Sequence, residues 1–248
     1  MAVEEGQRGD SVESPVVESI DGVEDVVDDD DDDIPALSAE ALAALKEYLA
    51  EQNVELAAAS EDAEDVELVA EDWRLSQFWY DRRTAETIAG EVVALSANLD
   101  SPRVACIACP TLYVYIKKLA PELPAQLLEY DQRFERYGTE FTFYDYNEPE
   151  NLPSPLKHSC HIVVADPPYL SKECLEKVAG TVKYLCKPGE CYTLLLTGEV
   201  QRDLAAQLLG LNPCGFRPQH SSKLGNEFRV FTSYDPGSRL DGWEISNA

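Results

Sequence analysis

The chain has 248 residues, which is long enough for one sizeable core with an appendage, and its formal net charge is −27. Residues 1–72 carry 25 Asp and Glu residues against only Arg8 and Lys46, a net charge of −23, whereas residues 73–248 are close to neutral at −4. Neither part has the basic excess of a nucleic-acid-binding surface, and no apolar run reaches the length of a membrane span.

The cysteines and the N-terminus bear on the compartment. Seven cysteines are scattered along the chain, and their odd number argues against a disulfide framework. The opening "MAVEEGQRGD" has neither the basic nor the apolar region of a secretory signal. We therefore expect a reducing, cytoplasmic location.

Residues 1–36 are predicted to form an acidic disordered tail. They are poor in aromatic residues and contain six consecutive aspartates, Asp28 to Asp33. Mutual repulsion and the lack of apolar surface oppose a packed core there. A solvating tail is the favoured interpretation, and a docking arm for a basic partner is the alternative.

Residues 37–72 are predicted to form a short N-terminal helix followed by an acidic linker. In "LSAEALAALKEYLAEQ", Ser38 can cap a helix that places three leucines on one face, namely Leu42, Leu45 and Leu49. The stretch "ASEDAEDVELVAED" has the composition of a linker. Aromatic and amphipathic sequence begins at Trp73, so we place the main domain at 73–248.

Apolar runs alternate with helical patterns through this domain. The predicted strands are 103–108, 125–129, 140–144, 161–165, 191–197 and 228–234, with a further short strand possible around 214–217. The predicted helices are 82–95, 111–119, 171–185 and 199–209. This alternation predicts an α/β fold whose parallel sheet is covered on both faces, with ligands bound at the carboxyl ends of the strands.

The first loop at such an end, "CIACP", contains no glycine, and none occurs between Gly90 and Gly138. A dinucleotide-binding fold needs glycines here so that backbone amides reach the pyrophosphate. A nucleoside ligand demands less, and the small Ala108 and Cys109 permit close approach. The pair Cys106-x-x-Cys109 offers a metal or redox alternative, weakened by the absence of a second such pair.

Acidic residues end the next two predicted strands. Glu129 follows Cys109 by 20 residues, the spacing at which nucleoside-binding folds place a carboxylate for the ribose hydroxyls. Asp131 is the competing candidate for this role. The third strand ends in "FYDYNEP", where Asp145 can accept a hydrogen bond from an adenine amino group.

The most specific motif is "IVVADPPYL", in which a buried strand runs directly into Asp166, Pro167, Pro168 and Tyr169. The prolines remove amide donors and fix the backbone, so the strand stops in a stiff loop. The Asp166 carboxylate and neighbouring carbonyls can accept hydrogen bonds from one amino group, and Tyr169 offers a face to a flat base or a cation. This arrangement predicts a site for a nitrogen nucleophile.

Two weaker signals remain. The stretch "HSCH", His158 to His161, has the letters of a metal site but leads into a buried strand, so the structural interpretation is favoured. The aromatic stretch before the helix at 82–95 is interpreted as core, with Gln77 or Thr84 at the border of a pocket.

With these motifs in order, the chain resembles the class I S-adenosylmethionine-dependent methyltransferases. More narrowly, it is similar to the family first described as N6-adenine-specific DNA methyltransferase 2 and since reassigned as lysine methyltransferases of eukaryotic translation elongation factor 1-alpha. The matching stretches, which span about 37–234, are "LSAEALAALKEY", "LSQFWYDRRTA", "RVACIACPTLY", "EYDQRF", "FYDYNEP", "ADPPYLSKECL", "TVKYL" and "NEFR". The glycine-poor first loop departs from the wider superfamily but fits this family.

The resemblance implies a Rossmann-like, mostly parallel seven-stranded sheet and methyl transfer to a lysine ε-amine of elongation factor 1-alpha. Carried across, Glu129 would hold the ribose, Asp145 the adenine amino group, and the Asp166 to Tyr169 loop the target amine. The other residues expected at the S-adenosylmethionine site are Tyr146, Cys106, Ala108 and Thr84. We expect a monomer that needs neither nucleic acid nor a membrane.

Two alternative functions stay open at this point. An N6-adenine methyltransferase acting on DNA or RNA shares the Asp-Pro-Pro-Tyr motif, but it needs a basic groove that the composition does not favour. A non-catalytic interaction module would use the acidic arm and a degenerate sheet.

Overall fold

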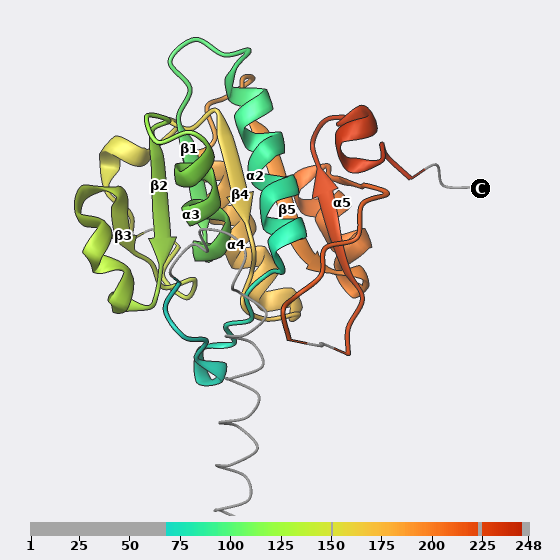
Figure 1. Ribbon diagram of the computed structural model, residues 1–248, viewed down its shortest axis with the longest axis horizontal. Helices are drawn as coiled ribbons and strands as arrows, with labels where there is room; N and C mark the ends of the chain where they lie inside the picture. Colours follow the sequence, from blue (N-terminus) through green and yellow to red (C-terminus); the bar gives the residue numbers. More distant parts are fainter. Residues whose placement is uncertain (1–67, 150, 223–224, 245–248) are drawn as a thin grey trace, which may run out of the picture. The chain divides into compact units, whose positions relative to one another are not determined.

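The computed structural model describes residues 68–149, 151–222 and 225–244; the predicted tail and the helix from Ser38 lie outside them. Its central feature is a seven-stranded sheet in the order β3-β2-β1-β4-β5-β7-β6 (Figure 1). The strands are β1 (Val104–Ile107), β2 (Ala125–Glu129), β3 (Phe141–Phe143), β4 (Ile162–Ala165), β5 (Tyr192–Gly198), β6 (Asn212–Pro213) and β7 (Phe228–Thr232). Strands β1 to β5 are parallel, and β7 runs antiparallel between β5 and β6. The predicted mostly parallel, Rossmann-like sheet is confirmed.

Helices cover both faces of this sheet. The α-helices are α2 (Arg82–Ser96), α3 (Pro110–Leu119), α4 (Lys172–Leu185) and α5 (Arg202–Leu209). Short 3-10 segments are η1 (Trp73–Leu75), η2 (Gln132–Glu140), η3 (Ser154–Leu156), η4 (Glu199–Gln201) and η5 (Gly237–Leu240). In the part of the chain that the structure describes, no helix combines the length and the apolar character that crossing a membrane requires.

The two-sided burial follows from the alternation of side chains along each strand. On β1, Val104 and Cys106 pack into the core under α2 and α3, whereas Ala105 and Ile107 point to the core under α4 and α5. All four are fully buried, as expected of a central parallel strand. In Figure 1, α2 and α3 lie in front of the sheet, and β2 points its carboxyl end toward the lower edge.

The predicted boundaries agree with the structure within one or two residues for most elements, with one correction. The short strand considered possible around 214–217 does form, but it lies about two residues earlier, at β6 (Asn212–Pro213). The chain then turns away from the sheet: the amide of Gly215 donates to the Gly242 carbonyl at 2.9 Å, and that of Phe216 to the Leu240 carbonyl at 3.1 Å. The predicted helix at 199–209 begins as the 3-10 segment η4.

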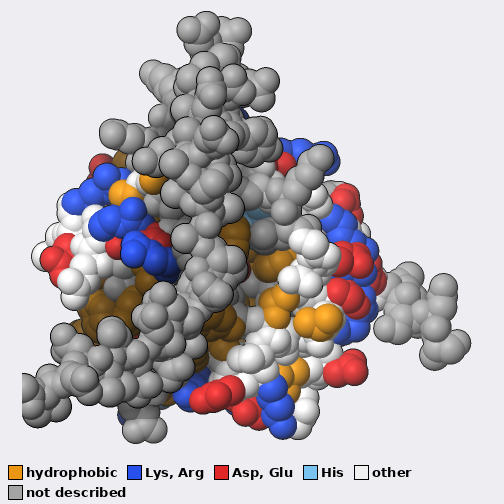
Figure 2. All heavy atoms as spheres, turned by 90° about the horizontal axis from the view of Figure 1, so that it is seen from below, with side chains coloured by type: hydrophobic (Ala, Val, Ile, Leu, Met, Phe, Trp, Pro, Cys, Tyr) orange, Lys and Arg blue, Asp and Glu red, His pale blue; other side chains and the backbone are white. Residues whose placement is uncertain are grey.

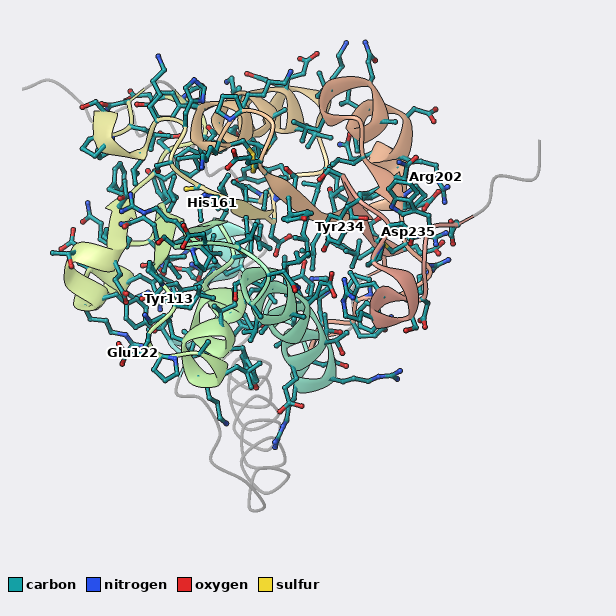
Figure 3. All side chains as sticks on the ribbon, turned by 90° about the horizontal axis from the view of Figure 1, so that it is seen from above. Tyr113, Glu122, His161, Arg202, Tyr234 and Asp235 are labelled. Carbon is teal, nitrogen blue, oxygen red and sulfur yellow. A yellow bond between two sulfur atoms is a disulfide. The ribbon has the colours of Figure 1, made fainter. Side chains whose placement is uncertain are left out.

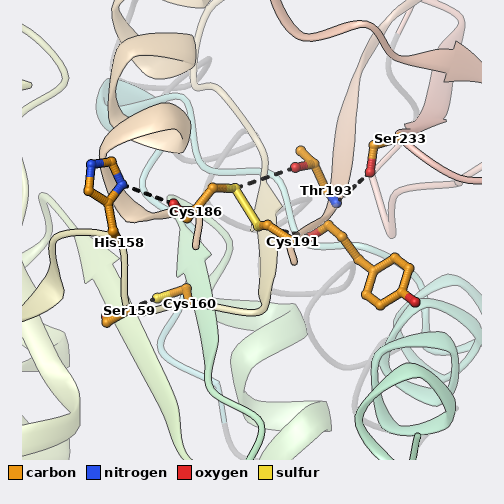
Figure 4. The surroundings of a disulfide bond; sticks show 8 residues. His158, Ser159, Cys160, Cys186, Cys191, Thr193 and Ser233 are labelled. Atoms are coloured by element: carbon orange, nitrogen blue, oxygen red, sulfur yellow. Dashed lines mark hydrogen bonds between the residues drawn. A yellow bond between two sulfur atoms is a disulfide. The ribbon is translucent and has the colours of Figure 1, made fainter. Parts of the chain in front are cut away.

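A disulfide joins Cys186 to Cys191 at the end of α4 (Figure 4). The cysteine count does not anticipate this bond. It spans a tight turn in which the Glu190 amide donates to the Lys187 carbonyl at 3.1 Å, so the two Cα atoms lie 5.5 Å apart. The remaining five cysteines are free thiols, and all of them are buried.

Candidate functional site

Two adjoining cavities lie where β1, β2, β3 and β4 end. The Asp145 cavity has a volume of about 310 Å³ and is lined by Leu75, Ala108, Glu129, Tyr130, Tyr144, Asp145, Tyr146, Asn147, Pro168 and Tyr169. The Asp166 cavity, of about 280 Å³, is lined by residues 75–80, 108–111, Glu129, 166–168, Leu170, His220, Asn226 and Phe228. Four residues belong to both walls, namely Leu75, Ala108, Glu129 and Pro168. Figure 2 looks at the molecule from below and shows hydrophobic side chains gathered in patches on this side.

In the loop after β1, which contains no glycine, an alanine adopts the left-handed backbone conformation that glycine usually adopts. Ala108 adopts a positive φ of 52°, a conformation that costs a non-glycine residue about 1–2 kcal/mol. Its amide donates to the Leu128 carbonyl at 2.8 Å, which ties the loop to β2. The methyl side chain is small enough to leave both cavities open. Cys106, in contrast, is buried in β1 and lines neither cavity, because its side chain points into the core under α2 and α3.

Glu129 ends β2 and faces both cavities while remaining only 6% exposed. Its Oε1 accepts hydrogen bonds from the amides of Tyr130 at 3.1 Å and Asp131 at 3.2 Å. Burial raises the pKa of this carboxyl to about 7, although these two hydrogen bonds oppose the shift. The group therefore changes charge near neutral pH.

Asp131 is engaged elsewhere and lines neither cavity. Its carboxylate accepts from Gln77 Nε2 at 2.9 Å and pairs with Arg133 at 2.6 Å. Burial by itself would raise its pKa, but the hydrogen bonds from Arg133 and Gln77 outweigh that effect and hold the pKa below its usual value. Between the two acids considered for the ribose, only Glu129 has a cavity in front of it.

The far wall of the Asp145 cavity is aromatic. Asp145 is partly exposed, and its Oδ1 accepts from the Asn147 amide at 2.8 Å. The rings of Tyr146 and Tyr169 meet edge to face with their centres 5.8 Å apart. Lys177 Nζ lies 5.6 Å from the centre of the Tyr146 ring. This cavity thus combines two acids with flat rings, which suits a nucleoside.

Asp166 stands where β4 ends in the two prolines. Its amide donates to the Ile107 carbonyl at 3.0 Å, the last bond of the strand pair before Pro167 and Pro168 interrupt it. Part of its side chain faces the cavity, and protein atoms enclose the rest. This burial raises the pKa of Asp166 to about 8; the Tyr80 hydroxyl opposes the rise and the charge of Glu129 adds to it.

The sequence analysis missed the wall that faces Asp166. Tyr80 is 5% exposed, and its ring stacks on His220 at 4.5 Å. Burial lowers the pKa of His220 to about 4, so this imidazole is neutral at pH 7. The sequence around Tyr80 has the pattern of core. Asn226 and Phe228 lie in the "NEFR" stretch, which the sequence analysis uses for the resemblance and for the start of a strand but not for a site. Nothing in local periodicity predicts that two segments so far apart meet.

The sequence analysis expects Gln77 or Thr84 at the border of a pocket. Gln77 does line the Asp166 cavity. Thr84 does not: it is 1% exposed, and its Oγ1 accepts from the Gln219 amide at 2.9 Å. This hydrogen bond anchors the loop that carries His220 to the first turn of α2.

The "HSCH" residues directly precede β4. His161 directly precedes β4, at the end opposite Asp166, and is labelled in Figure 3, which views the molecule from above. His158 is exposed, and its Nδ1 lies 3.0 Å from the Cys186 carbonyl oxygen. Among the described residues, no group of three His, Cys, Asp or Glu side chains is arranged to hold a metal ion.

Comparison with known proteins places this arrangement in a family. Residues 71–236 match the family model described as "Probable N6-adenine methyltransferase". The chain is 46% identical to the EEF1A lysine methyltransferase 1 of Homo sapiens, over 82% of this chain and 94% of that protein. It is 36% identical to the protein-lysine N-methyltransferase M142.8 of Caenorhabditis elegans, over 82% of this chain and 95% of that protein.

Among solved structures, the branched-chain polyamine synthase of Thermus thermophilus superposes with a TM-score of 0.47 at 16% identity, over 73% of this chain and 62% of that one. The sequence matches are far stronger. The family model covers the sheet and the residues that line both cavities, and the alignments cover 94% and 95% of the two relatives. The chain therefore belongs to the family of the EEF1A lysine methyltransferase 1 proteins.

Proposed function

We propose that this protein transfers a methyl group from S-adenosylmethionine to a lysine ε-amine of EEF1A. The observation that carries the proposal is the shared wall of the two cavities, at Leu75, Ala108, Glu129 and Pro168. A methyl donor in the Asp145 cavity and an amine in the Asp166 cavity would meet across this wall. The name of the human relative supports EEF1A as the acceptor protein.

The Asp145 cavity fits the nucleoside part of the cofactor. Glu129 would accept hydrogen bonds from the ribose hydroxyls, and Asp145 would accept one from the adenine amino group. Tyr146 and Tyr169 would contact the base and the amine, and the compact Ala108 would let the ligand pass between the cavities. When bound, S-adenosylmethionine supplies an electrophilic methyl group on a sulfonium ion.

The Asp166 cavity fits an amine that must lose a proton. A lysine side chain has a reference pKa of about 10.4, so it arrives as an ammonium ion and has no free electron pair for attack. Asp166, with its pKa raised to about 8 by burial, is a much better matched proton acceptor than an ordinary aspartate. We infer that Asp166 both orients the amine and takes its proton. The loop carbonyls before Tyr169 then hold the amine in line with the methyl group.

We further propose that residues 73–248 suffice for this reaction, and that the enzyme acts in the cytoplasm as a monomer on a protein acceptor, without nucleic acid or a membrane. The nearly neutral charge of −4 over this domain supports a protein acceptor rather than a polyanion.

The direct test is incubation of the protein with labelled S-adenosylmethionine and purified EEF1A, followed by mass spectrometry of the modified lysine. Asp166→Asn should cut turnover by roughly a hundredfold or more while cofactor affinity changes little, because the amide keeps one carbonyl acceptor but cannot take the proton. Asp145→Asn is the matched control, since the same change in the other cavity should weaken cofactor binding instead. Label in the adenine of added nucleic acid, with none in protein, would refute the lysine acceptor.

A further inference from the structure

The Tyr80 hydroxyl is a buried polar group without a hydrogen-bond partner. The Tyr80 side chain lines the Asp166 cavity, and the residue as a whole is only 5% exposed. An unpaired buried hydroxyl destabilises a folded protein, and phenylalanine would fill the same space without that cost. The hydroxyl is therefore a feature that packing alone does not explain.

The surrounding chain holds this ring firmly in place. The Tyr80 ring stacks on His220, and the neighbouring Asp81 amide donates to the Gln219 carbonyl at 2.9 Å. On the other side, the Ser221 amide donates to the Trp79 carbonyl at 2.9 Å. Hydrogen bonds thus join two segments that are far apart in the sequence on either side of Tyr80. They fix the position of the ring and limit the positions that its hydroxyl can reach.

Asp166 lies on the same cavity wall as Tyr80 and interacts with it electrostatically. Each of the two residues perturbs the pKa of the other: the Tyr80 hydroxyl favours the ionised Asp166 carboxylate, although the two groups form no hydrogen bond here. The other titratable groups on this cavity wall are Glu129, Cys109 and His220. Glu129 opposes ionisation of Asp166, the pKa of the buried Cys109 thiol is raised well above its usual value, and His220 is neutral. Thr111 also brings an unpaired hydroxyl to this wall, but it is the Tyr80 hydroxyl that favours a charged Asp166.

We propose that Tyr80 is a positioning residue whose hydroxyl donates a hydrogen bond to the Asp166 carboxylate once that group is ionised, and so keeps it available to the acceptor amine. This inference rests on the proposed methyl transfer, and Tyr80 acts on the amine through Asp166 alone.

The test is the pH dependence of methyl transfer to purified EEF1A by Tyr80→Phe. Loss of a hydrogen bond to a charged group should lower kcat/KM at pH 7 by about tenfold. The loss should shrink as the pH rises above that of the Asp166 transition, because the carboxylate then ionises without help. Cofactor affinity should stay at the wild-type value and the melting temperature should stay the same or rise, since phenylalanine keeps the ring stacked on His220 and removes a buried hydroxyl that has no partner.

Tyr113→Phe is the matched control. The Tyr113 hydroxyl is outside both cavities and donates to Glu140 Oε2 at 2.7 Å, so its removal should lower stability and spare kcat/KM. A double-mutant cycle completes the test: in the Asp166→Asn background, adding Tyr80→Phe should cause no further loss.

Two results would overturn the role of Tyr80 alone: unchanged kcat/KM in Tyr80→Phe at pH 7, or losses that multiply in the double mutant, because Tyr80 would then act independently of Asp166. Absence of methyl transfer by the wild-type protein would overturn the proposed function as well, so the wild type is assayed first.

Discussion

Glu129→Gln should stabilise the protein without ligand and weaken its hold on the cofactor. Burial raises the pKa of this carboxyl from 4.5 to about 7, so the folded state holds the proton more tightly than the unfolded state. The resulting stabilisation is complete below pH 4.5 and is lost as the pH rises through 7. A shift of this size corresponds to about 3 kcal/mol in the free energy of unfolding.

Glutamine removes the charge but keeps a carbonyl oxygen for the amides of Tyr130 and Asp131. We therefore expect the variant to match the wild type in stability at pH 4 and to exceed it by about 3 kcal/mol at pH 8. Urea denaturation at a series of pH values measures this difference. Calorimetry with S-adenosylmethionine should show the opposite trend, with affinity reduced in the variant at pH 8.

Glu129→Ala is the control, because it removes the charge together with the acceptor for both amides and should be less stable than the glutamine variant at every pH. Parallel pH curves for the wild type and Glu129→Gln would refute the reasoning, since they would mean that burial does not perturb this carboxyl.

The remaining predictions concern backbone space, the N-terminus and the cofactor. Gly215→Ala should destabilise the protein by about 1–3 kcal/mol, because the new Cβ would lie 2.7 Å from the Asp241 carbonyl oxygen. Gly180→Ala, on the open face of α4, should instead stabilise the protein by about 0.5–1 kcal/mol, and thermal unfolding compares the two variants. A chain that starts at residue 37 should keep its melting temperature and its turnover with saturating EEF1A, and a large fall in either would show that the acidic tail docks on the domain. The affinity of the wild type for S-adenosylmethionine should fall as the pH drops below about 7, where Glu129 takes up its proton, and a flat profile in calorimetry would contradict the ribose role.

The sequence predicts those parts of the site that depend on strand ends. A buried parallel strand such as β4 reads as an apolar run, and the residue that follows it must lie at the carboxyl edge of the sheet. For this reason the amino-acid sequence alone is enough to place Asp166, Glu129 and Asp145 near one another. The same rule places Ala108 at the junction of the two cavities, although its left-handed backbone could not be anticipated from a residue that rarely adopts it.

Long-range contacts escape prediction because local patterns carry no information about them. Tyr80 and His220 belong to segments joined by hydrogen bonds between residues 135 and 142 positions apart. The aromatic stretch before α2 therefore has the pattern of core, and no local signal singles out His220. The prediction that Cys106 lies at the cofactor site is wrong for a different reason. Side chains alternate along β1, and that of Cys106 points into the core, away from the loop that follows the strand. The disulfide depends on the shape of one turn, which a count of cysteines does not describe.

The two cavities draw on different lengths of the chain, and this bears on how such an enzyme could change its acceptor. Every residue that lines the Asp145 cavity lies between Leu75 and Tyr169, whereas the Asp166 cavity is closed by His220, Asn226 and Phe228. Under the proposed function, cofactor recognition is encoded in one contiguous stretch, and part of the acceptor wall comes from a separate segment near β7. Insertions or replacements around residues 218–228 would reshape the entrance for the incoming amine and leave the nucleoside contacts in place. A scaffold divided in this way can acquire new acceptors by exchanging a single loop.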